Sequence, residues 1–363
     1  MPPRSTVFVC ACEPSGDLYA SFFVKHQLNE KNCIISGVGG PNLKKAGIEL
    51  IFDYENLTTL GFASAISSSL RNYEMYRKVC RKIYTIKPEI FVAVAYPGLN
   101  LLLSRYAKKL GARVIYLLPP QIWAWGTIRK YFIKKWTNLV ISVFPFEYQF
   151  YNHYGIKTAY WHNPLFEELK KYKRIDFDKR IGLMPGSRLS EIKKNLPVIM
   201  EVIKRLKENA KHRSMDIKFC LILHSEKTIG ISDFTRSFQD IDLRLITRDR
   251  YHHMVNCDLI ITCSGTASLE AGIMNIPQIF FNRPGFVDYY FFRRFLRIKE
   301  YNLTNLYFGE TIVPSFVMRN NKRLIEKVVE TIIKYFENPD YLHKRYAGMQ
   351  QFRQPKISNE RSI

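Results

Sequence analysis

The sequence predicts an α/β protein built from two doubly wound, parallel-sheet domains in tandem. Three observations support this prediction: strand-like runs alternate with helical segments, these runs are continuously apolar, and one polar stretch interrupts the rhythm. Continuously apolar strands are typical of a parallel sheet that is covered on both faces, whereas half-exposed strands alternate. Regular alternation of strands with helices in turn predicts the doubly wound arrangement.

Five apolar runs in the first half indicate strands, and helical patterns follow most of them. The strand-like runs are TVFVCAC, CIISGVGG, EIFVAVAY, RVIYLLPP and LVISVF. The helical segments are DLYASFFVKHQL, LNLLLSRYAKKLG, TIRKYFIKKW and FEYQFYNHYG. The polar stretch FEELKKYKRIDFDKR (166–180) then ends the rhythm and is typical of a linker.

The second half shares the architecture of the first without repeating its sequence. Its strand-like runs are RIGLMPG, DIKFCLIL, LRLIT, DLIITC and PQIFF, and a long amphipathic helix follows the first of them. The segment NNKRLIEKVVETIIKYF predicts a further helix before the polar end KISNERSI. The predicted organisation is a first domain at 1–165, a linker at 166–178, a second domain at 179–335 and a helical tail at 336–363.

The composition is that of a soluble globular protein, with 47% apolar and 24% charged residues. No stretch approaches the ~18 uninterrupted apolar residues of a membrane-spanning helix. The start of the chain lacks the pattern of a signal peptide. Seven scattered cysteines without a Cys-x-x-Cys pair favour reduced thiols in a cytoplasm over a zinc site or a disulfide framework.

The net charge of +23 favours an anionic partner, which could be nucleic acid, an anionic membrane face or a phosphorylated substrate. The alternative is a general enrichment in lysine without functional meaning. Because the sequence contains no recognisable nucleic-acid-binding module and no long basic block, nucleic acid is the least favoured of these partners.

Ligands of open parallel sheets bind at the carboxyl ends of strands, so the turns there are the first places to search for chemistry. The first such turn, CEPSGDLYA, opens a helix with Ser15 and Gly16. A functional turn and a simple helix cap by Ser15 or Asp17 both fit this pattern, and the cap is favoured when the turn is taken alone.

The second turn, LMPGSRLSEI, combines three residue types that suit a phosphate. Gly186 lets the backbone approach a ligand, Ser187 offers a hydroxyl, and Arg188 offers a fork of donors. The turn is not a P-loop, since it lacks the Gly-Lys-Ser/Thr ending. A structural turn with a solvated arginine remains the alternative.

The third turn, TCSGTASLEAGI, places three small residues directly before a helix. The free amides and the dipole of a helix start bind anions, and Ser264, Gly265 and Thr266 would let a phosphate reach the backbone. Glu270 lies about one turn further on, within reach of sugar hydroxyls, as in dinucleotide folds. The pattern therefore predicts a nucleotide site, and the alternative is a helix start with favourable first-turn acidity.

The fourth turn, LLPPQIWAWGTIRKYFIKKW, carries Trp123 and Trp125 followed by basic residues. The tryptophans suit a lipid or sugar surface, or a wedge in the core. The segment FVDYYFFRRFLRIK (286–299) mixes aromatic residues with Arg293, Arg294, Arg297 and Lys299. It predicts an amphipathic helix for an anionic membrane interface, with a buried inter-domain helix as the alternative.

These motifs together resemble those of the lipid-A-disaccharide synthases. The motifs, in order, are CEPSGDLYAS, GVGGPNLKKAGIEL with LTTLGFASAI, PPQIWAW, FPFEYQFYNHYGI, LMPGSRLSEIKKNLPV, CSGTASLEAG and NLTNLYFGETIVPSF. The resemblance spans about residues 5 to 355. It implies an inverting glycosyltransferase of the GT-B type, with two Rossmann-like domains facing a cleft and C-terminal helices packing back toward the N-terminal domain.

The resemblance also implies substrates and a location. The family transfers 2,3-diacylglucosamine from UDP onto 2,3-diacylglucosamine 1-phosphate at the inner face of the cytoplasmic membrane, without a metal ion or other cofactor. Both substrates are anionic amphiphiles, which agrees with the basic charge. An anionic membrane surface is therefore an expected partner, nucleic acid is not, and a homodimer is possible.

Site residues follow by position from the same resemblance. UDP would be bound by Gly186, Ser187, Arg188, Ser264, Gly265, Thr266, Glu270 and Asn305. The acceptor would face Glu13, Ser15, Gly16, Asp17, Asn100, Trp123 and Trp125. Arg188 would also serve catalysis by stabilising the leaving UDP.

Two stretches depart from the pattern of the family. After the run EIFVA the family usually has Ile-Asp-x-Pro-Asp-Phe-Asn, whereas this chain has VAYPGLN, so that Ala95 and Gly98 replace both acids. The Gly-His-Pro-Leu of the family is here HNPL, with Asn163 in the histidine position. An inverting transfer needs a base, and Glu13 and Asp17 are the remaining candidates.

The sequence therefore predicts a cytoplasmic, membrane-peripheral glycosyltransferase in which the acceptor 6-hydroxyl attacks the anomeric carbon of the donor. Two alternatives remain open. One is a paralogue that binds a UDP-sugar or glycolipid without transferring it, as the loss of the two acids suggests. The other is a nucleic-acid-binding protein that uses the positive charge.

Overall fold

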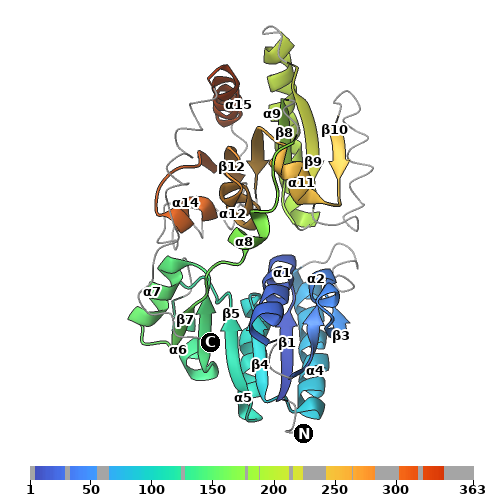
Figure 1. Cartoon of the computed structure of the whole chain (residues 1–363), viewed down its shortest axis with the longest axis vertical. Helices are drawn as coiled ribbons and strands as arrows, with labels where there is room; N and C mark the ends of the chain where they lie inside the picture. Colours follow the sequence, from blue (N-terminus) through green and yellow to red (C-terminus); the bar gives the residue numbers. More distant parts are fainter. Residues whose placement is uncertain are drawn as a thin grey trace. The chain divides into compact units, whose positions relative to one another are not determined.

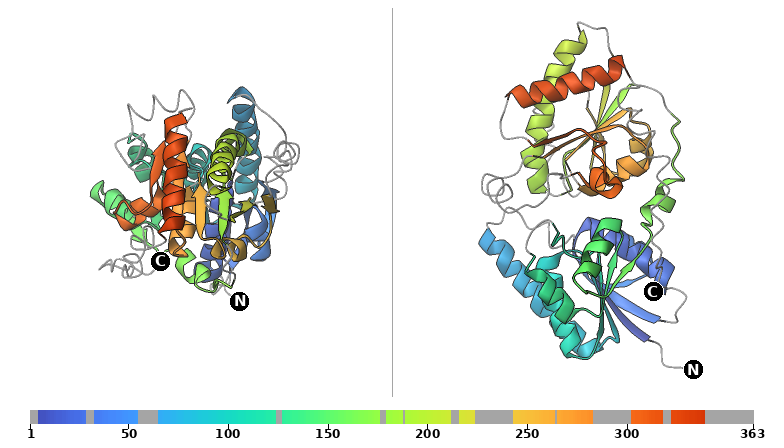
Figure 2. Two further views of the ribbon diagram at one scale, coloured as in Figure 1. Left: turned by 90° about the horizontal axis from the view of Figure 1, so that it is seen from above. Right: turned by 90° about the vertical axis from the view of Figure 1, so that its left-hand side faces the viewer.

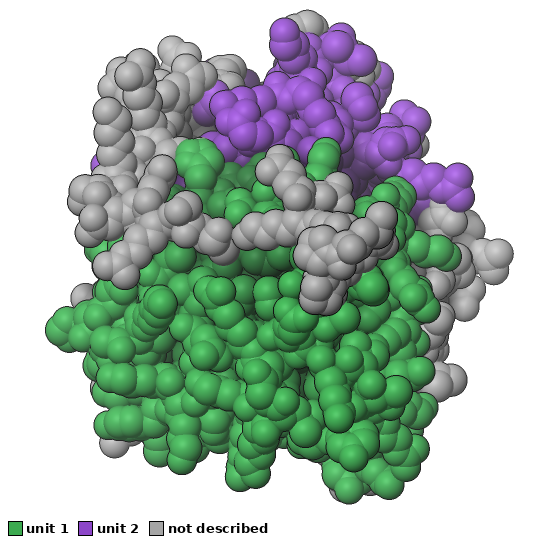
Figure 3. Space-filling view, turned by 60° about the horizontal axis from the view of Figure 1, so that its bottom comes forward, with its two compact units in different colours: residues 1–164, 356–363 green, residues 165–355 purple. Residues whose placement is uncertain are grey.

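The structure is a computed structural model of the whole chain, drawn in Figure 1 and from two further sides in Figure 2. Two compact units are distinguished, one formed by residues 1–164 with 356–363 and the other by residues 165–355 (Figure 3). The residues that the structure describes are 5–28, 33–54, 65–123, 127–175, 179–187, 189–211, 216–223, 243–263, 265–282, 302–317 and 322–338.

The first unit contains a seven-stranded parallel sheet in the order β3-β2-β1-β4-β5-β6-β7, counted over the described residues (Figure 1). Its strands are β1 Ser5–Ala11, β2 Cys33–Gly39, β3 Glu49–Asp53, β4 Ile90–Val94, β5 Arg113–Leu117, β6 Leu139–Ser142 and β7 Thr158–Tyr160. Its helices are α1 Pro14–Phe23, continued by the π-helical turn Val24–Leu28, then α2 Pro41–Lys45, α4 Ala65–Ile86, α5 Pro97–Lys109, α6 Arg129–Trp136 and α7 Pro145–His153.

Helices cover both faces of this sheet. Alternate strand residues such as Phe8 and Phe91, whose rings stack 6.0 Å apart, join a core to which α4, α5, α6 and α7 all contribute. Helix α1 contacts β1 and β4 without belonging to that core, so it lies on the opposite face. Burial on both faces explains why the strands are continuously apolar in the sequence.

The second unit contains a six-stranded parallel sheet in the order β10-β9-β8-β11-β12-β13 among the residues described. Its strands are β8 Arg180–Met184, β9 Lys218–Ile222, β10 Leu243–Ile246, β11 Leu259–Thr262, β12 Gln278–Asn282 and β13 Ser315–Val317. Its helices are α8 Leu165–Leu169, α9 Leu189–Lys211, α11 Arg250–Val255, α12 Gly265–Ile273, α14 Leu303–Phe308 and α15 Lys322–Glu337.

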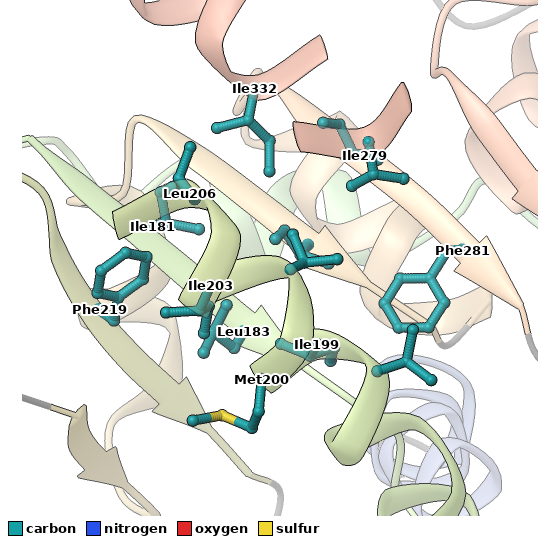
Figure 4. Close-up of a cluster of buried hydrophobic side chains, with 14 of the residues drawn as sticks. Ile181, Leu183, Ile199, Met200, Ile203, Leu206, Phe219, Ile279, Phe281 and Ile332 are labelled. Carbon is teal, nitrogen blue, oxygen red and sulfur yellow. The ribbon is translucent and has the colours of Figure 1, made fainter. Parts of the chain in front are cut away.

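The core of the second unit forms around α9, which lays its apolar side on the sheet (Figure 4). Ile199 and Ile203 of α9 meet Leu183 of β8 in this cluster, and Ile332 of α15 packs against the same core. The other face of the sheet carries a separate cluster that includes Met254 of α11 and residues of α12. Both faces are therefore covered, and the predicted doubly wound α/β class is confirmed in each unit.

Strand order reverses once in each sheet, between β1 and β4 in the first unit and between β8 and β11 in the second. At such a switch point the connections leave the sheet on opposite faces, which opens a crevice at the carboxyl ends of the two central strands. The turns CEPSGD and AYPG follow β1 and β4, and the turns PGSR and CSGT follow β8 and β11. The topology thus brings the singled-out motifs together in pairs.

The predicted linker at 166–178 is packed against the second unit along its described part. Residues 165–169 form α8, and the Arg174 guanidinium lies 2.7 Å from the carboxylate of Asp258. The ring of Tyr172 lies 5.2 Å from that of Tyr251. The described part of the predicted linker therefore contacts the second unit, and the division between the units falls at residues 164 and 165. Helix α15 ends at Glu337, and residues 339–363 of the predicted tail lie outside the described residues.

Candidate active site

In the second unit, two helices begin at the switch point. The backbone N–H of Cys263, after β11, donates to the carbonyl of Met184, at the end of β8, with a distance of 3.0 Å. Helix α9 starts at Leu189 and α12 at Gly265, so both N-terminal ends lie just beyond these neighbouring strand ends. The first amides of a helix have no partner within it and carry a partial positive charge, which makes this edge suited to a phosphate.

The turn that connects β8 to α9 is shaped by side chains of α9. Gly186 has a φ of +140°, and a Cβ at this position would lie 2.6 Å from the Cβ of Glu191, so only glycine fits. The Ser187 amide donates to a Glu191 carboxylate oxygen at 3.0 Å, and the Asn195 amide donates to the Pro185 carbonyl at 2.7 Å. The turn is therefore held in one conformation. Arg188, the predicted phosphate ligand, lies outside the described residues.

The small residues at the start of α12 have a structural role in addition to the predicted one. A Cβ on Gly265 would lie 2.9 Å from a methyl carbon of Leu303, and one on Gly272 would lie 2.6 Å from the methyl carbon of Thr304. Both glycines therefore allow α14 to pack closely on α12. Thr266 is half-exposed at the helix start, as a phosphate contact requires, and Ser264 lies outside the described residues.

The space around two glycines, one in each unit, predicts that alanine has opposite effects on stability at the two positions. Gly272→Ala should lower the free energy of unfolding by about 1–3 kcal/mol, because its methyl group overlaps Thr304 in a packed core. Gly98→Ala should raise it by about 0.4–1 kcal/mol, because nothing lies within 4 Å of the new methyl group. Hydrogen exchange of the full chain, followed at amides of each unit separately, gives both values. Equal effects of the two substitutions would contradict the α12–α14 contact.

Glu270 lies on α12 and is fully buried. Its Oε1 accepts hydrogen bonds from the Arg250 guanidinium at 2.6 Å and from the Tyr251 hydroxyl at 2.9 Å. Its Oε2 is buried and finds no hydrogen-bond partner among the described residues. Burial raises the pKa of Glu270, while the charge and hydrogen bond of Arg250 oppose that rise. One oxygen is thus fixed, and the other is a buried acceptor whose hydrogen-bonding capacity is not met by the described residues.

Arg250 and Tyr251 belong to the candidate site although the sequence analysis did not single them out. They open α11, which follows β10, so they stand at the same edge of the sheet as the turns after β8 and β11. The one feature of the sequence that could have indicated them is their position shortly after the apolar run LRLIT. Their partner Glu270 is 20 residues away in the sequence, and that distance hid the pairing.

In the first unit, Glu13 stands where the chain leaves β1 for α1. It occupies the position before the first helical residue with an extended backbone, and its carbonyl accepts from the Asp17 amide at 2.9 Å. The Ser15 hydroxyl donates to its Oε1 at 3.2 Å. A Cβ placed on Gly16 would lie 3.5 Å from the Cγ of Glu13 and 3.6 Å from the Cβ of Ala95. The half-buried Glu13 side chain is therefore close to the turn after β4.

The turn after β4 is held in an uncommon backbone conformation. Ala95 and Tyr96 have φ values of +49° and +42°, in the left-handed region that residues other than glycine, asparagine and aspartate rarely adopt. The carbonyl of Ala95 accepts from the Asn100 amide at 2.9 Å and from the Tyr116 hydroxyl at 2.8 Å. Such strain costs on the order of 1–3 kcal/mol per residue and is concentrated at functional sites.

Asn100 serves this turn and does not face a ligand through its amide nitrogen. Besides Ala95, the nitrogen donates to the carbonyls of Cys10 at 3.2 Å and Val94 at 2.9 Å. The side chain is fully buried and ties the ends of β1 and β4 together. Its Oδ1 is buried and has no hydrogen-bond partner among the described residues, so the amide nitrogen is structural and the acceptor-side role of Asn100 stays a prediction.

Asp17 likewise has a structural role. Its Oδ1 accepts from the backbone amides of Gly40 at 2.7 Å and Leu43 at 3.2 Å, and its Oδ2 accepts from the backbone and side-chain nitrogens of Asn42, both at 2.9 Å. The carboxylate is fully buried and caps the start of α2 from outside that helix. Burial raises its pKa, and these hydrogen bonds oppose the rise. With both oxygens occupied, Asp17 is poorly placed to take a proton from a substrate.

Trp123 is a core residue and not part of an exposed lipid or sugar surface. It is 8% exposed, and its ring packs edge-on against Phe146 with centroids 4.9 Å apart. Its indole N–H donates to Glu147 Oε1 at 2.8 Å. Of the two interpretations of the tryptophan pair, the wedge is correct for Trp123. Trp125 lies outside the described residues.

A family model identifies the protein family to which this arrangement belongs. The model described as lipid-A-disaccharide synthetase matches residues 7–362. The chain belongs to this family. It is therefore an enzyme, a glycosyltransferase of lipid A biosynthesis, as the resemblance in the sequence implied.

Relatives within the family agree over almost the whole chain. A lipid-A-disaccharide synthase of Geobacter metallireducens is 30% identical over an alignment that covers 97% of this chain and 93% of the relative. Lipid-A-disaccharide synthase 1 of Legionella pneumophila is 31% identical over an alignment that covers 87% of this chain and 85% of the relative.

Solved structures resemble the chain at the level of the fold. The UDP-GlcNAc 2-epimerase of Neisseria meningitidis, bound to UDP-GlcNAc, has a TM-score of 0.61 at 11% identity and covers 94% of both chains. The Methanocaldococcus jannaschii UDP-GlcNAc 2-epimerase, in complex with UDP-GlcNAc and UDP, has a TM-score of 0.60 at 12% identity and covers 91% and 92%. The predicted class of two Rossmann-like domains of the GT-B type is confirmed.

Two of the three positions at which the chain departs from the lipid-A-disaccharide synthase pattern keep room for the acids of the family. Ala95 has a left-handed backbone, which aspartate tolerates better than alanine, and nothing lies within 4 Å of a Cβ on Gly98. Asn163, in the histidine position of the family, is buried and accepts from the Tyr19 hydroxyl at 3.0 Å. The fold thus tolerates these replacements without losing the local geometry.

Asn305 organises a loop of the second unit. Its Oδ1 accepts from the amides of Ile312 at 2.9 Å and Val313 at 2.8 Å, and its Nδ2 donates to the Val313 carbonyl at 3.0 Å. The side chain is 2% exposed. These contacts replace the predicted donor-facing role by a structural one.

Two other observations concern membranes and metals. Within the described ranges, no helix combines the length and apolar character that crossing a membrane requires. The same ranges contain no cluster of three or more His, Cys, Asp or Glu side chains that could hold a metal ion. The predicted interfacial segment 286–299, with Arg293 and Arg294, lies outside the described residues.

Proposed function

We propose that the chain transfers 2,3-diacylglucosamine from UDP-2,3-diacylglucosamine to 2,3-diacylglucosamine 1-phosphate, giving the lipid A disaccharide 1-phosphate and UDP. The observation that carries this proposal is the buried Oε2 of Glu270, which lacks a partner among the described residues and belongs to α12, whose start follows the strand next to the one before α9. A hydroxyl-bearing anion satisfies both features at once, and a UDP-sugar is such a molecule. Family membership supports the choice of the acylated sugar.

In the proposed donor complex, the diphosphate lies over the starts of α9 and α12. Gly186, Ser187 and Arg188 meet it from one turn, and Ser264, Gly265 and Thr266 meet it from the other. Glu270 accepts from the ribose hydroxyls, because Arg250 and Tyr251 hold its Oε1 and leave Oε2 for the ligand. The charge that develops on the departing UDP is stabilised by these amides and by Arg188.

In the proposed reaction, the acceptor 6-hydroxyl attacks the anomeric carbon as the bond to UDP breaks, with inversion. Its proton passes to the Glu13 carboxylate. Glu13 is favoured over Asp17 because it is half-buried at the end of β1 and close to Ala95, where the family has an acid, whereas Asp17 caps α2 with both oxygens. Ser15 orients the base through its hydrogen bond. Ser15 and Gly16 remain proposed as acceptor-side residues.

The chain is further proposed to act in the cytoplasm, at the anionic inner face of the cytoplasmic membrane, since its acceptor is a lipid and its net charge is +23. A homodimer stays a prediction. The second candidate function is a paralogue that binds the UDP-sugar or glycolipid without transfer, and Ala95 and Gly98 favour it. Incubation with both substrates, followed by mass spectrometry of the lipid, separates the two: absence of disaccharide with several acyl lengths supplied favours the binder.

The proposed nucleotide site makes a prediction for UDP. Arg188→Ala should weaken UDP binding by about 1.5–3 kcal/mol, since it removes a charge-assisted phosphate contact, and Glu270→Ala should weaken it by about 1 kcal/mol. The matched control, Arg244→Ala, removes an exposed arginine from β10 and should bind UDP as the wild type does. Calorimetry on variants shown to be folded by circular dichroism measures these values. Unchanged affinity in both site variants would remove the proposed nucleotide site.

A further inference from the structure

Helices α5 and α6 of the first unit carry large apolar side chains on their exposed sides. Ile128 is 67% exposed, Tyr131 is 64% exposed and Phe132 is 40% exposed, and Leu102 on α5 is 45% exposed. Isolated exposed apolar residues are ordinary, whereas several together on packed helices mark an interaction surface. We call this surface the α5–α6 face and define it by Leu102, Arg105, Lys109, Ile128, Tyr131, Phe132, Lys134 and Lys135.

The spacing of these residues places the exposed ones on one side of α6. Ile128, Tyr131, Phe132 and Lys135 are separated by three, four and seven positions, the spacing of one helix face, and the helical backbone already includes Ile128. Ile133, which points to the opposite side, is fully buried in the core of the first unit. The apolar residues on the outer side are thus additional to those that anchor the helix.

Contacts between the helices join the two exposed surfaces. The Arg105 guanidinium lies over the ring of Trp136, 5.6 Å from its centroid, and Trp136 stacks on Phe132 at 4.7 Å. Helices α5 and α6 are packed neighbours in the first unit. The exposed residues of both helices therefore form one continuous face.

All the charged side chains in the part of the sequence that contains α5 and α6 are positive. Between residues 90 and 146 the sequence contains eight lysine and arginine residues and no aspartate or glutamate. Four of these cations, Arg105, Lys109, Lys134 and Lys135, are exposed on the α5–α6 face. A surface with this composition attracts anions, and no carboxylate within that stretch reduces the attraction.

The combination of apolar and basic residues indicates which kind of partner the α5–α6 face can bind. A second copy of the same face would repel it, because both carry the same positive charge. Nucleic acid would pair with the lysines but would offer nothing to Ile128 or Leu102. An anionic bilayer satisfies both kinds of side chain, since cations meet the head groups while aliphatic and aromatic residues enter the interface.

We propose that the α5–α6 face is the surface by which this chain binds an anionic lipid bilayer. The inference rests on the proposed function in one respect, because a transferase with a lipid acceptor must meet a membrane. Helix α5 begins at Pro97, directly after the strained turn at Ala95 and Tyr96. The same helix thus connects the acceptor-side turn to the bilayer-facing residues.

Flotation with vesicles tests the inference directly. The full chain should float with vesicles of phosphatidylcholine mixed with phosphatidylglycerol and not with phosphatidylcholine alone. Lys134→Glu with Lys135→Glu should lower partitioning by about 30-fold or more, because each cation near an anionic surface changes binding by about fivefold. Ile128→Ser with Phe132→Ser should also lower it markedly, since both side chains are exposed and their loss leaves the core intact.

A matched control carries the same change of net charge elsewhere. Lys322→Glu with Lys327→Glu alters two exposed lysines of α15 in the second unit and should partition as the wild type does. Equal losses in this control, or wild-type partitioning of both face variants, would overturn the inference and in the latter case point to residues 286–299. Tighter binding to duplex DNA than to anionic vesicles, insensitive to Ile128→Ser with Phe132→Ser, would also overturn it.

Vesicle binding can be tested separately from the proposed reaction. UDP affinity, measured on the same proteins, should be unchanged in all three variants because the proposed nucleotide site lies in the second unit. A wild-type chain that binds vesicles but not UDP would contradict the proposed function and leave the α5–α6 face standing. A chain that binds UDP but never vesicles would contradict the role of the α5–α6 face and leave the proposed function standing.

Discussion

Glu13→Gln is expected to lower the rate of disaccharide formation by roughly 10²- to 10⁴-fold, the usual cost of losing a general base. UDP affinity should be unchanged, since the proposed donor site lies in the second unit. Glutamine keeps the size of the side chain and can still accept the Ser15 hydrogen bond, so the turn after β1 is preserved. Mass spectrometry of the lipid product and calorimetry with UDP measure the two quantities.

Asp17→Asn is the matched control for this prediction. It should reduce the stability of the first unit, because an amide cannot accept all the hydrogen bonds that Asp17 receives from α2, while the folded fraction keeps its activity. Ala95→Asp should add little to the rate if Glu13 is the base. Full activity of Glu13→Gln, or recovery of a weak wild-type rate by Ala95→Asp, would assign the proton transfer to another group.

The central strands could be predicted because burial on both faces leaves a continuous apolar run. Strand β1 shows this directly, with residues 7–11 all buried. The edge strand β3 was missed because every one of its residues is partly or fully exposed, which breaks the run. Strands β7 and β13 have only three residues each, too few to form a pattern. Sequence periodicity therefore describes the centre of each sheet better than its edges.

The candidate site was predicted less completely, and the reason is physical. A motif shows that a residue is constrained but not whether a ligand or the fold constrains it. Asp17 and Asn305 both stand in motifs, yet their partners are backbone groups of α2 and of the loop at 312–313. Glu270 differs because one of its oxygens has no partner in the described part of the chain. Only the structure separates these cases, since the partners of Asp17 are 23 to 26 residues away.

The buried carboxyl of Glu147 gives the stability of the first unit a dependence on pH. Glu147 opens α7, is 2% exposed, accepts from the Trp123 indole at 2.8 Å, and lies 3.0 Å from the Ser142 hydroxyl. Burial raises its pKa from 4.5 to about 7, although both hydrogen bonds oppose the rise. The folded state therefore holds a proton between these pH values that the unfolded state has released.

The sign of the effect follows from that proton. The stabilisation is fully present below about pH 4.5 and is lost as the pH rises through about 7, where Glu147 must ionise inside the core. The loss amounts to about 3 kcal/mol, since each pKa unit corresponds to about 1.4 kcal/mol. Above neutral pH, the Trp123 contact is thus held by a buried, unpaired charge.

Glu147→Gln is expected to remove this dependence. The glutamine oxygen can accept from Trp123 and its amide can donate to Ser142, so both contacts survive without a charge. The variant should match the wild type in free energy of unfolding near pH 4.5 and exceed it by about 3 kcal/mol near pH 8. Because all four tryptophans lie within residues 1–164, fluorescence during urea denaturation reports this unit alone. A constant difference between the two proteins at every pH would show that Glu147 is ionised throughout the range and that burial does not govern its proton.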